Sequence, residues 1–406
     1  MTPHDARTLL ESCLHRDRGR LEATGLPPAE CSVWADLSGL AASQRVRPLL
    51  YRALKSRGLE GHTPAGLRDN VALAYRDTAL RNLRLCAELA RVARALAARD
   101  VPVLVLKGAH LVGEVYRDVG LREMNDLDVL VRVEHLSTAV NVLLERGYRS
   151  LYPFTIESDV AAGHHLTRFV KRDVAGIEIH WNITPPHPPH AIDPADLWRR
   201  AVSLTIAGVP MRGLCPVDLL LHLCFHASFQ HQFQFGLRPF CDIAATIDRY
   251  GADIDWAVLV RQARDWNWTR GVYLTLRLAR DLVGARVPAD VFRTLAPADF
   301  DDEMLETAST LIFSEPIPPI EAQTVGVTGA AARFRHLARL ALRLRKQTAA
   351  RYPAGPRSAA LGWYGLVRPT HLLRRGRTVA RLLLNNDQAL KARVERANRI
   401  HTWMSA

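Results

Sequence analysis

The segment Asp126-Leu127-Asp128-Val129-Leu130-Val131 constrains this chain most, because two acids open an otherwise apolar run. A short apolar run of this kind is typical of a buried strand. Since side chains alternate along a strand, Asp126 and Asp128 point to the same face. Burying two like charges is costly unless a cation or hydrogen-bond donors compensate for them. The pair is therefore a candidate site for one or two Mg²⁺ ions held against the phosphates of a nucleotide.

The same spacing of two aspartates occurs twice more, so the sequence contains its own comparison. Asp253-Ile254-Asp255 precedes a predicted helix that begins at Trp256, and Asp299-Phe300-Asp301 precedes one that begins near Glu303. We interpret both as N-caps and first-turn acids. Only the first pair has a strand after it and a strand–Lys–Gly–helix unit before it.

A third carboxylate lies in Gly176-Ile177-Glu178-Ile179-His180-Trp181, where apolar residues alternate with Glu178. An antiparallel strand here could lie beside the Asp126/Asp128 strand, and Glu178 would then complete a carboxylate triad. It could act as general base for an incoming hydroxyl or help to hold the metal. The alternative is a solvent-facing glutamate on a half-exposed strand.

The unit before the acid pair begins with the apolar run 101–106, a predicted strand that ends at Lys107-Gly108 and is followed by a helix-like segment, 109–117. Lys107 could neutralise a β- or γ-phosphate. Gly108 could let the backbone approach the phosphates at a helix N-terminus. The alternative for Lys107 is a surface lysine at a strand end.

Several further residues are candidates for the cleft. Arg122 could pair with the carboxylates, bind substrate phosphate or simply face solvent in a chain rich in arginine. Tyr116 could contact nucleotide or pack against the sheet. The His222/His226 spacing is a weak zinc signal. We expect base or acceptor contacts from the following side chains: His180, His226, His231 and Asp242.

The periodicity predicts an α+β fold, with a small mixed sheet flanked by helices and a helical C-terminal half. We divide the chain into an N-terminal helical region (1–98), a catalytic core (99–212), a helical domain that closes the cleft (213–330) and a basic helical tail (331–406). The predicted helices of the tail cover roughly 332–348 and 371–400.

Charge is concentrated in the tail. The chain of 406 residues has a net charge of +13. Residues 331–406 carry 17 Lys and Arg against two acids, Asp387 and Glu395, whereas the first 330 residues are nearly neutral. Such a tail favours phosphate-rich partners: nucleic acid, anionic lipid or an acidic protein. The alternative is a purely structural role, in which a tail helix packs on the rest of the protein and its basic face is solvated.

The N-terminus and the cysteines bear on location. The first 20 residues lack the apolar core of a signal peptide, and no apolar run is long enough to cross a bilayer. The six cysteines form no C-x-x-C pair and are expected to be reduced, mostly buried thiols. The expected location is the cytoplasm.

Taken in order, these motifs resemble the nucleotidyltransferase superfamily related to polymerase beta and the aminoglycoside nucleotidyltransferases. They are most similar to a bacterial family usually labelled "uncharacterised nucleotidyltransferase". The resemblance covers roughly 75–330 and leaves the basic tail unexplained. The chain departs from the wider superfamily at Gly108-Ala109, where a Gly-Ser or Gly-Gly turn is usual, so no hydroxyl is available at 109. The motifs that carry the resemblance are Leu106-Lys107-Gly108, Tyr116, Arg122, Asp126 to Val131, Glu178 to Trp181, and His226, His231 and Asp242.

The resemblance implies an enzyme that uses Mg²⁺ and an NTP, with Asp126, Asp128 and Glu178 as catalytic metal ligands. It would transfer NMP to a hydroxyl of a small molecule or of a ribosomally made peptide such as a lasso peptide. Kinase-type attack at the γ-phosphorus needs the same clamp and stays open. An RNA-directed enzyme, for instance a tRNA-directed toxin, is a further alternative, which the basic tail favours and the nearly neutral body disfavours. The intact Asp126, Asp128 and Glu178 argue against a non-catalytic scaffold that kept the fold.

Overall fold

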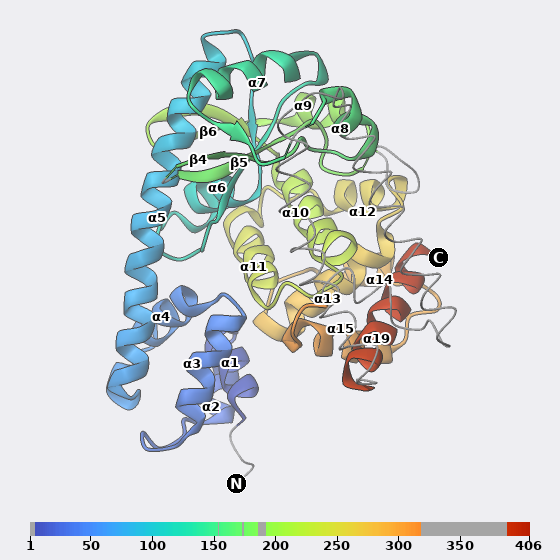
Figure 1. The fold of residues 1–406 in the computed structure, drawn as a ribbon. Coiled ribbons are helices and arrows are strands. Elements are labelled where there is room, and N and C mark those ends of the chain that lie inside the picture. Colours follow the sequence, from blue (N-terminus) through green and yellow to red (C-terminus); the bar gives the residue numbers. More distant parts are fainter. Residues whose placement is uncertain (1–4, 153, 173, 186–191, 318–387) are drawn as a thin grey trace, which may run out of the picture.

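The computed structural model describes residues 5–152, 154–172, 174–185, 192–317 and 388–406. Within these ranges the chain forms a seven-stranded mixed sheet in the order β3-β4-β5-β2-β1-β7-β6, surrounded by helices (Figure 1). The predicted α+β fold, with a mixed sheet flanked by helices and a helical C-terminal half, is thus confirmed. The strands are β1 (Leu104–Val105), β2 (Asp126–Leu130), β3 (Arg149–Ser150), β4 (Phe169–Lys171), β5 (Val174–His180), β6 (Val202–Ile206) and β7 (Val209–Gly213).

The two faces of the sheet pack against different cores. On β2, Leu127 and Val129 belong to a core formed with helix α5, whereas Leu130 belongs to the core of the helical half of the chain. Because side chains alternate along a strand, Asp126 and Asp128 share the face of Leu130 and point toward the helical half. Because Leu127 and Val129 are buried against α5, the acid pair must face the opposite side of the sheet.

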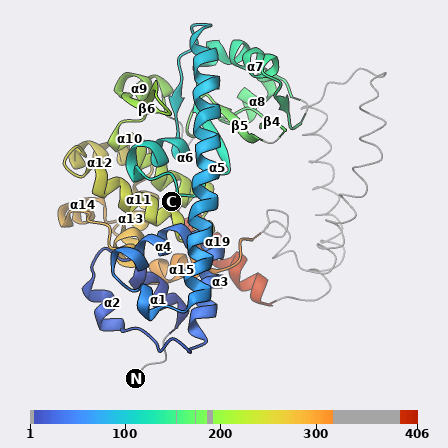
Figure 2. The ribbon, with the colours of Figure 1, turned by 90° about the vertical axis from the view of Figure 1, so that its left-hand side faces the viewer.

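The N-terminal region is helical, as predicted. Helix α5 is the longest of the described helices and runs along the molecule past the sheet (Figure 2). Its buried residues include Leu85, Leu89 and Leu96 at helical spacing. The helices before the sheet are α1 (Ala6–Leu14), α2 (Gly19–Thr24), α3 (Val33–Ser43), α4 (Arg47–Ser56) and α5 (Ala65–Ala97), with a 3₁₀ turn at Glu60–His62.

Short helices connect the strands. A single turn, α6 (Lys107–His110), continues as a π-helical segment, Leu111–Tyr116, directly after β1. The other connections contain a 3₁₀ turn (Val133–His135), α7 (Leu136–Glu145), α8 (Ile156–Ala162) and α9 (Pro194–Arg200).

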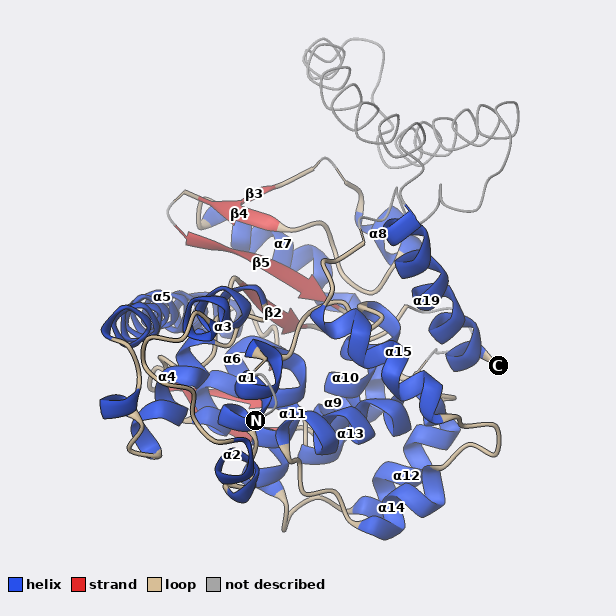
Figure 3. Cartoon of the chain, turned by 90° about the horizontal axis from the view of Figure 1, so that it is seen from below, coloured by secondary structure: helices blue, strands red, loops and turns tan. Residues whose placement is uncertain are grey.

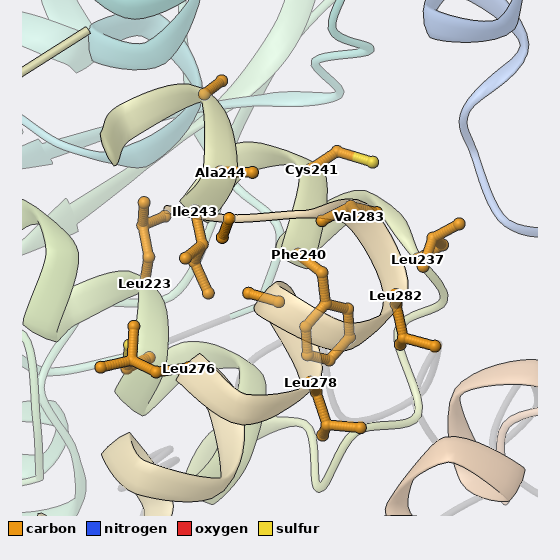
Figure 4. Packing of buried hydrophobic residues seen from close by; sticks show 14 of the residues in the cluster. Leu223, Leu237, Phe240, Cys241, Ile243, Ala244, Leu276, Leu278, Leu282 and Val283 are labelled. Atoms are coloured by element: carbon orange, nitrogen blue, oxygen red, sulfur yellow. The ribbon is translucent and has the colours of Figure 1, made fainter. Parts of the chain in front are cut away.

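The C-terminal half packs its helices around a large apolar core, in which Phe240 of α11 lies against α13 (Figure 4). Its helices are α10 (Pro216–Phe225), a π-helical segment (His226–Gln230), α11 (Arg238–Tyr250), α12 (Trp256–Asp265), α13 (Thr269–Val283), α14 (Ala289–Leu295), α15 (Asp302–Phe313) and α19 (Gln388–Ser405). Helix α19 packs on α15, so the end of the predicted basic tail belongs to this body. The predicted tail helix at 332–348 lies outside the described residues.

One prediction about the sheet is wrong. Strand β5 does lie beside β2, but it runs parallel to it rather than antiparallel (Figure 3). The reason is that β4 and β5 form an antiparallel hairpin across 171–174, which reverses the chain once more before it reaches β2. Strands β6 and β7 likewise form a hairpin, because Ala207 and Gly208 both adopt positive φ and form a tight turn.

Candidate active site

The register between β2 and β5 brings the predicted carboxylates together. Asp128 is directly opposite Glu178, and Asp126 is opposite Gly176. Paired residues on neighbouring strands share a face, so all three carboxylates point to the same side of the sheet. They line one cavity of about 500 Å³.

Lys107 and Gly108 line the same cavity, at the end of the neighbouring strand β1. The Lys107 ammonium nitrogen lies 3.9 Å from Asp128 Oδ1, and this lysine holds a positive φ of 36°. A non-glycine residue in that region is strained, and strain of this kind clusters at functional sites. A Cβ at Gly108 would lie 3.1 Å from Met124 and 3.2 Å from an Arg122 nitrogen, so a side chain there would crowd both.

The three carboxylates have different electrostatic environments. Burial raises the pKa of Asp126 and of Glu178, and the charge of Asp128 raises both further. Burial acts on Asp128 too, but Lys107 and a hydrogen bond from His180 outweigh it and lower the pKa of Asp128. Asp128 is thus the firmly ionised member, whereas at Asp126 and Glu178 the nearby charge of Lys107 does not offset burial and the repulsion by Asp128. A divalent cation would relieve this repulsion.

His180 adds a nitrogen donor to the group. Its Nε2–H donates to Asp128 Oδ1 at 3.0 Å, and ligand atoms of Asp128, Glu178 and His180 lie within 4.8 Å of one another. Burial lowers the pKa of His180 to about 4, so its imidazole is neutral. The carboxylate oxygens are the ligands that Mg²⁺ prefers, whereas His180, whose Nε2 carries the proton donated to Asp128, orients that carboxylate.

Further histidines face the carboxylates from the helical half. His226 and His231 line the cavity, their Nε2 atoms 3.1 Å apart, so one donates to the other. Burial holds the pKa of His226 well below its ordinary value and lowers that of His231 to about 4. Both are neutral at physiological pH and add hydrogen-bonding capacity without charge.

The structure separates Tyr116 and Asp242 from this set. Both belong to a buried cluster with Arg122: the Arg122 Nε donates to Asp242 at 3.0 and 3.1 Å, and the Tyr116 hydroxyl donates to Asp242 Oδ1 at 2.9 Å. Burial opposes the charge on Arg122, but Asp242 keeps its pKa above the ordinary value. Of these three residues, only Arg122 lines the carboxylate cavity. The cluster fixes how Arg122 is presented to that cavity.

Sequence reasoning missed several residues of this wall. Arg45 comes from the N-terminal helices, whereas Gln230, Phe235 and Arg238 come from the segment after α10. The Arg45 and Arg238 guanidinium carbons lie 4.3 and 5.0 Å from the centre of the Phe235 ring. The alternation of glutamine and aromatic residues over 230–235 was an available signal for a polar wall. Nothing near Arg45 in the sequence indicates its role, because only tertiary packing brings it here.

The two comparison Asp-x-Asp pairs are N-caps, as predicted. The Asp255 side chain accepts from the backbone N–H of Val258, and Asp301 accepts from that of Glu303. Neither pair lines the carboxylate cavity. All three pairs have the same spacing, but Asp126 and Asp128 lie on a strand, whereas the other two pairs precede helices.

The structure also bears on the cysteines and on membrane spans. All six cysteines are free thiols, and four of them are buried: Cys13, Cys86, Cys224 and Cys241. Across the described ranges, no helix combines the length and the apolar composition needed to cross a bilayer.

A mixed sheet with an acid pair on one strand, a third acid on its neighbour and a Lys-Gly turn beside them defines this chain as a nucleotidyltransferase. The chain belongs to the family described as "uncharacterised nucleotidyltransferase", which matches residues 30–284. This confirms both the family and the enzyme class predicted from the motifs.

Two solved structures resemble the chain at low similarity. The antibiotic-resistance factor ANT(2'')-Ia is 12% identical, with a TM-score of 0.34, over 45% of this chain and 93% of that one. JHP933 from Helicobacter pylori is 14% identical, with a TM-score of 0.29, over 65% of this chain and 97% of that one. Comparison with curated proteins finds no relative. At these levels neither neighbour bears on the substrate of this enzyme.

Proposed function

We propose that this enzyme transfers a nucleoside monophosphate from an NTP to a hydroxyl of an acceptor, with Mg²⁺ as its cofactor. The observation that carries the proposal is the convergence of Asp126, Asp128 and Glu178 beside Lys107 in one cavity. Nucleotide phosphates need positive charge and a cation held by carboxylates, and the side chains for both lie on the same wall.

Each side chain has a distinct part in the proposed reaction. Asp126, Asp128 and Glu178 would hold the Mg²⁺, which neutralises phosphate charge when bound. Lys107 and Arg122 bind the triphosphate, and the absence of a side chain at Gly108 leaves room for the Arg122 guanidinium. The acceptor oxygen bonds to the α-phosphorus, the bond from the α-phosphorus to the β-bridging oxygen breaks, and pyrophosphate leaves. A Glu178 oxygen that does not contact the Mg²⁺ takes the hydroxyl proton.

A second cavity of about 700 Å³ adjoins the first and is our candidate for the acceptor site. The two share four lining residues: Arg45, Gln230, His231 and Phe235. The volume falls within the roughly 300–1,000 Å³ of small-molecule sites. Helix α19 lines it as well, through Val394, Ala397 and Asn398.

The lining of this second cavity favours an uncharged, hydrogen-bonding acceptor. Its described residues include five side-chain amides against one arginine, Arg45, and one acid, Glu315. The Gln44 side chain is 3% exposed, and its Oε1 has no hydrogen-bond partner among the described residues, so a donor group of a ligand would satisfy it. A segment of a ribosomally made peptide, a lasso peptide among them, and a neutral small molecule both fit. A polycation fits poorly.

The proposal is tested by incubating the full chain with Mg²⁺, α- or γ-labelled NTPs, and hydroxyl-bearing peptides, neutral small molecules and RNA. We expect the α-label to move onto a peptide or small molecule, with release of pyrophosphate. Movement of the γ-label would indicate a kinase, and movement onto RNA would favour the RNA-directed alternative.

Asp128→Asn is the matched test of the site, with Asp255→Asn as its control. The first removes a buried charge from the cavity, whereas the second alters an N-cap of the same spacing. We expect Asp128→Asn to lower transfer by about a thousandfold or more, as loss of a charge-stabilising group does in other enzymes. Equal transfer by both variants would refute the assignment.

The cytoplasmic location and the binding of nucleic acid by the basic tail (331–406) remain predictions from the sequence.

A further inference from the structure

A third cavity, of about 220 Å³, is lined by four arginines: Arg16, Arg18, Arg52 and Arg57. It lies where the end of α1, helix α4 and helix α11 meet, on elements that carry none of the proposed metal ligands. Its size is below the roughly 300–1,000 Å³ of drug-sized sites, so it suits a small ligand.

The positive charge in this cavity exceeds the negative charge around it. Asp248 is the one acid among the described lining residues, and it pairs with Arg16 at 2.8 Å. Two other arginines each have a buried acidic partner: Arg122 pairs with Asp242, and Arg200 binds Asp218 through two hydrogen bonds of 2.9 and 3.0 Å. In this cavity, by contrast, Arg16 is the one lining arginine with an ion-pair partner among the described residues.

Arg57 shows the effect of this excess. One of its terminal nitrogens donates to the His15 carbonyl, whereas the other, Nη1, is buried without a hydrogen-bond partner among the described residues. Burial lowers the pKa of Arg57, and the charges of Arg18 and Arg16 lower it further, against opposing effects of Cys13 and Asp17. A buried donor on an underneutralised guanidinium is costly unless an acceptor reaches it.

We propose that this cavity binds a small oxyanion of the phosphate class. Guanidinium groups present forked N–H donors that match phosphate oxygens, and several of them around one small cavity supply both the charge and the hydrogen bonds. Inorganic phosphate and pyrophosphate share this chemistry. The inference rests on the arginine cluster alone and does not depend on the proposed transfer reaction.

A buried cluster separates this cavity from the carboxylates. Tyr116 lines the arginine cavity, and its hydroxyl donates to Asp242, which in turn accepts from Arg122 at the edge of the carboxylate cavity. The two cavities share no lining residue, so each can be altered without removing a residue that lines the other.

The experiment is titration calorimetry of the full chain with inorganic phosphate and, separately, with pyrophosphate, both in EDTA so that no metal contributes. The variants are Arg52→Gln and Arg57→Gln, with Arg94→Gln, an exposed arginine on α5, as the charge-matched control. Lys107→Gln reports on anion binding in the carboxylate cavity. Because Arg52 is itself exposed, its variant keeps the test valid if Arg57→Gln does not fold.

We expect the wild type and Arg94→Gln to bind the anion alike, and any binding lost in Lys107→Gln to belong to the carboxylate cavity rather than to this one. Loss of one charged hydrogen bond should weaken binding by about tenfold or more in Arg52→Gln and Arg57→Gln. Whichever anion binds more tightly is the assigned ligand class. The proposal is overturned if the wild type binds neither anion, if Arg52→Gln binds as tightly as Arg94→Gln, or if Lys107→Gln alone loses binding.

Discussion

Replacing Asp242 with asparagine tests the reassignment of Arg122, Tyr116 and Asp242 to one buried cluster. Asp242 is 2% exposed and accepts from Arg122 and from the Tyr116 hydroxyl. The substitution leaves the Arg122 guanidinium, itself 7% exposed, without an opposite charge. Breaking a buried ion pair from one side costs about 3–5 kcal/mol, because the remaining charge stays desolvated.

The measurement is the free energy of unfolding in urea for the wild type, Asp242→Asn, Arg122→Met and the double variant. We expect each single variant to lose about 3–5 kcal/mol and the double variant to lose less than the sum, because both charges are then gone. If Asp242→Asn costs under about 1 kcal/mol, as an exposed pair would, the cluster does not contribute as we argue. If Asp242→Asn instead abolishes nucleotide transfer but does not change stability, Asp242 contacts base or acceptor, as the sequence predicted.

Three further predictions follow from particular contacts. Lys107→Met removes the ammonium 3.9 Å from Asp128, so the affinity for the Mg²⁺–NTP complex should fall by about 10- to 100-fold in equilibrium binding, with Arg94→Met unchanged. Gly213→Ala places a Cβ onto Leu204 and 2.8 Å from His110 Nδ1, so it should cost about 1–3 kcal/mol of unfolding free energy. Gly39→Ala, whose Cβ meets nothing within 4 Å, should be neutral or stabilising. Burial opposes ionisation of Glu88, but hydrogen bonds from Arg91 and Tyr148 and the charge of Lys171 lower its pKa below the unfolded value. Its stabilising effect is therefore present above about pH 4.3 and is lost as the pH falls through the folded-state pKa. Glu88→Gln should therefore lower the free energy of unfolding at pH 7. It should also reduce the difference between the unfolding free energies measured at pH 7 and at pH 4; an unchanged difference would contradict this.

Local sequence was sufficient to predict the parts of the site that lie on single elements. The alternation in β2 determines that Asp126 and Asp128 share one face of their strand, and the alternation in β5 does the same for Glu178 and His180, because side-chain direction along a strand has a period of two. The two N-caps at Asp255 and Asp301 were also predictable, since a cap depends on residues within one turn.

Packing decided the rest. The parallel pairing of β5 with β2 depends on the hairpin that precedes it, and the strand pattern alone is compatible with either direction. Arg45 reaches the cavity wall only because the N-terminal helices pack there. Arg122 and Asp242 are 120 residues apart, so no local pattern could show that they neutralise each other. Strand periodicity is a property of neighbouring residues, whereas the pairing of buried charges depends on which distant side chains share a desolvated space.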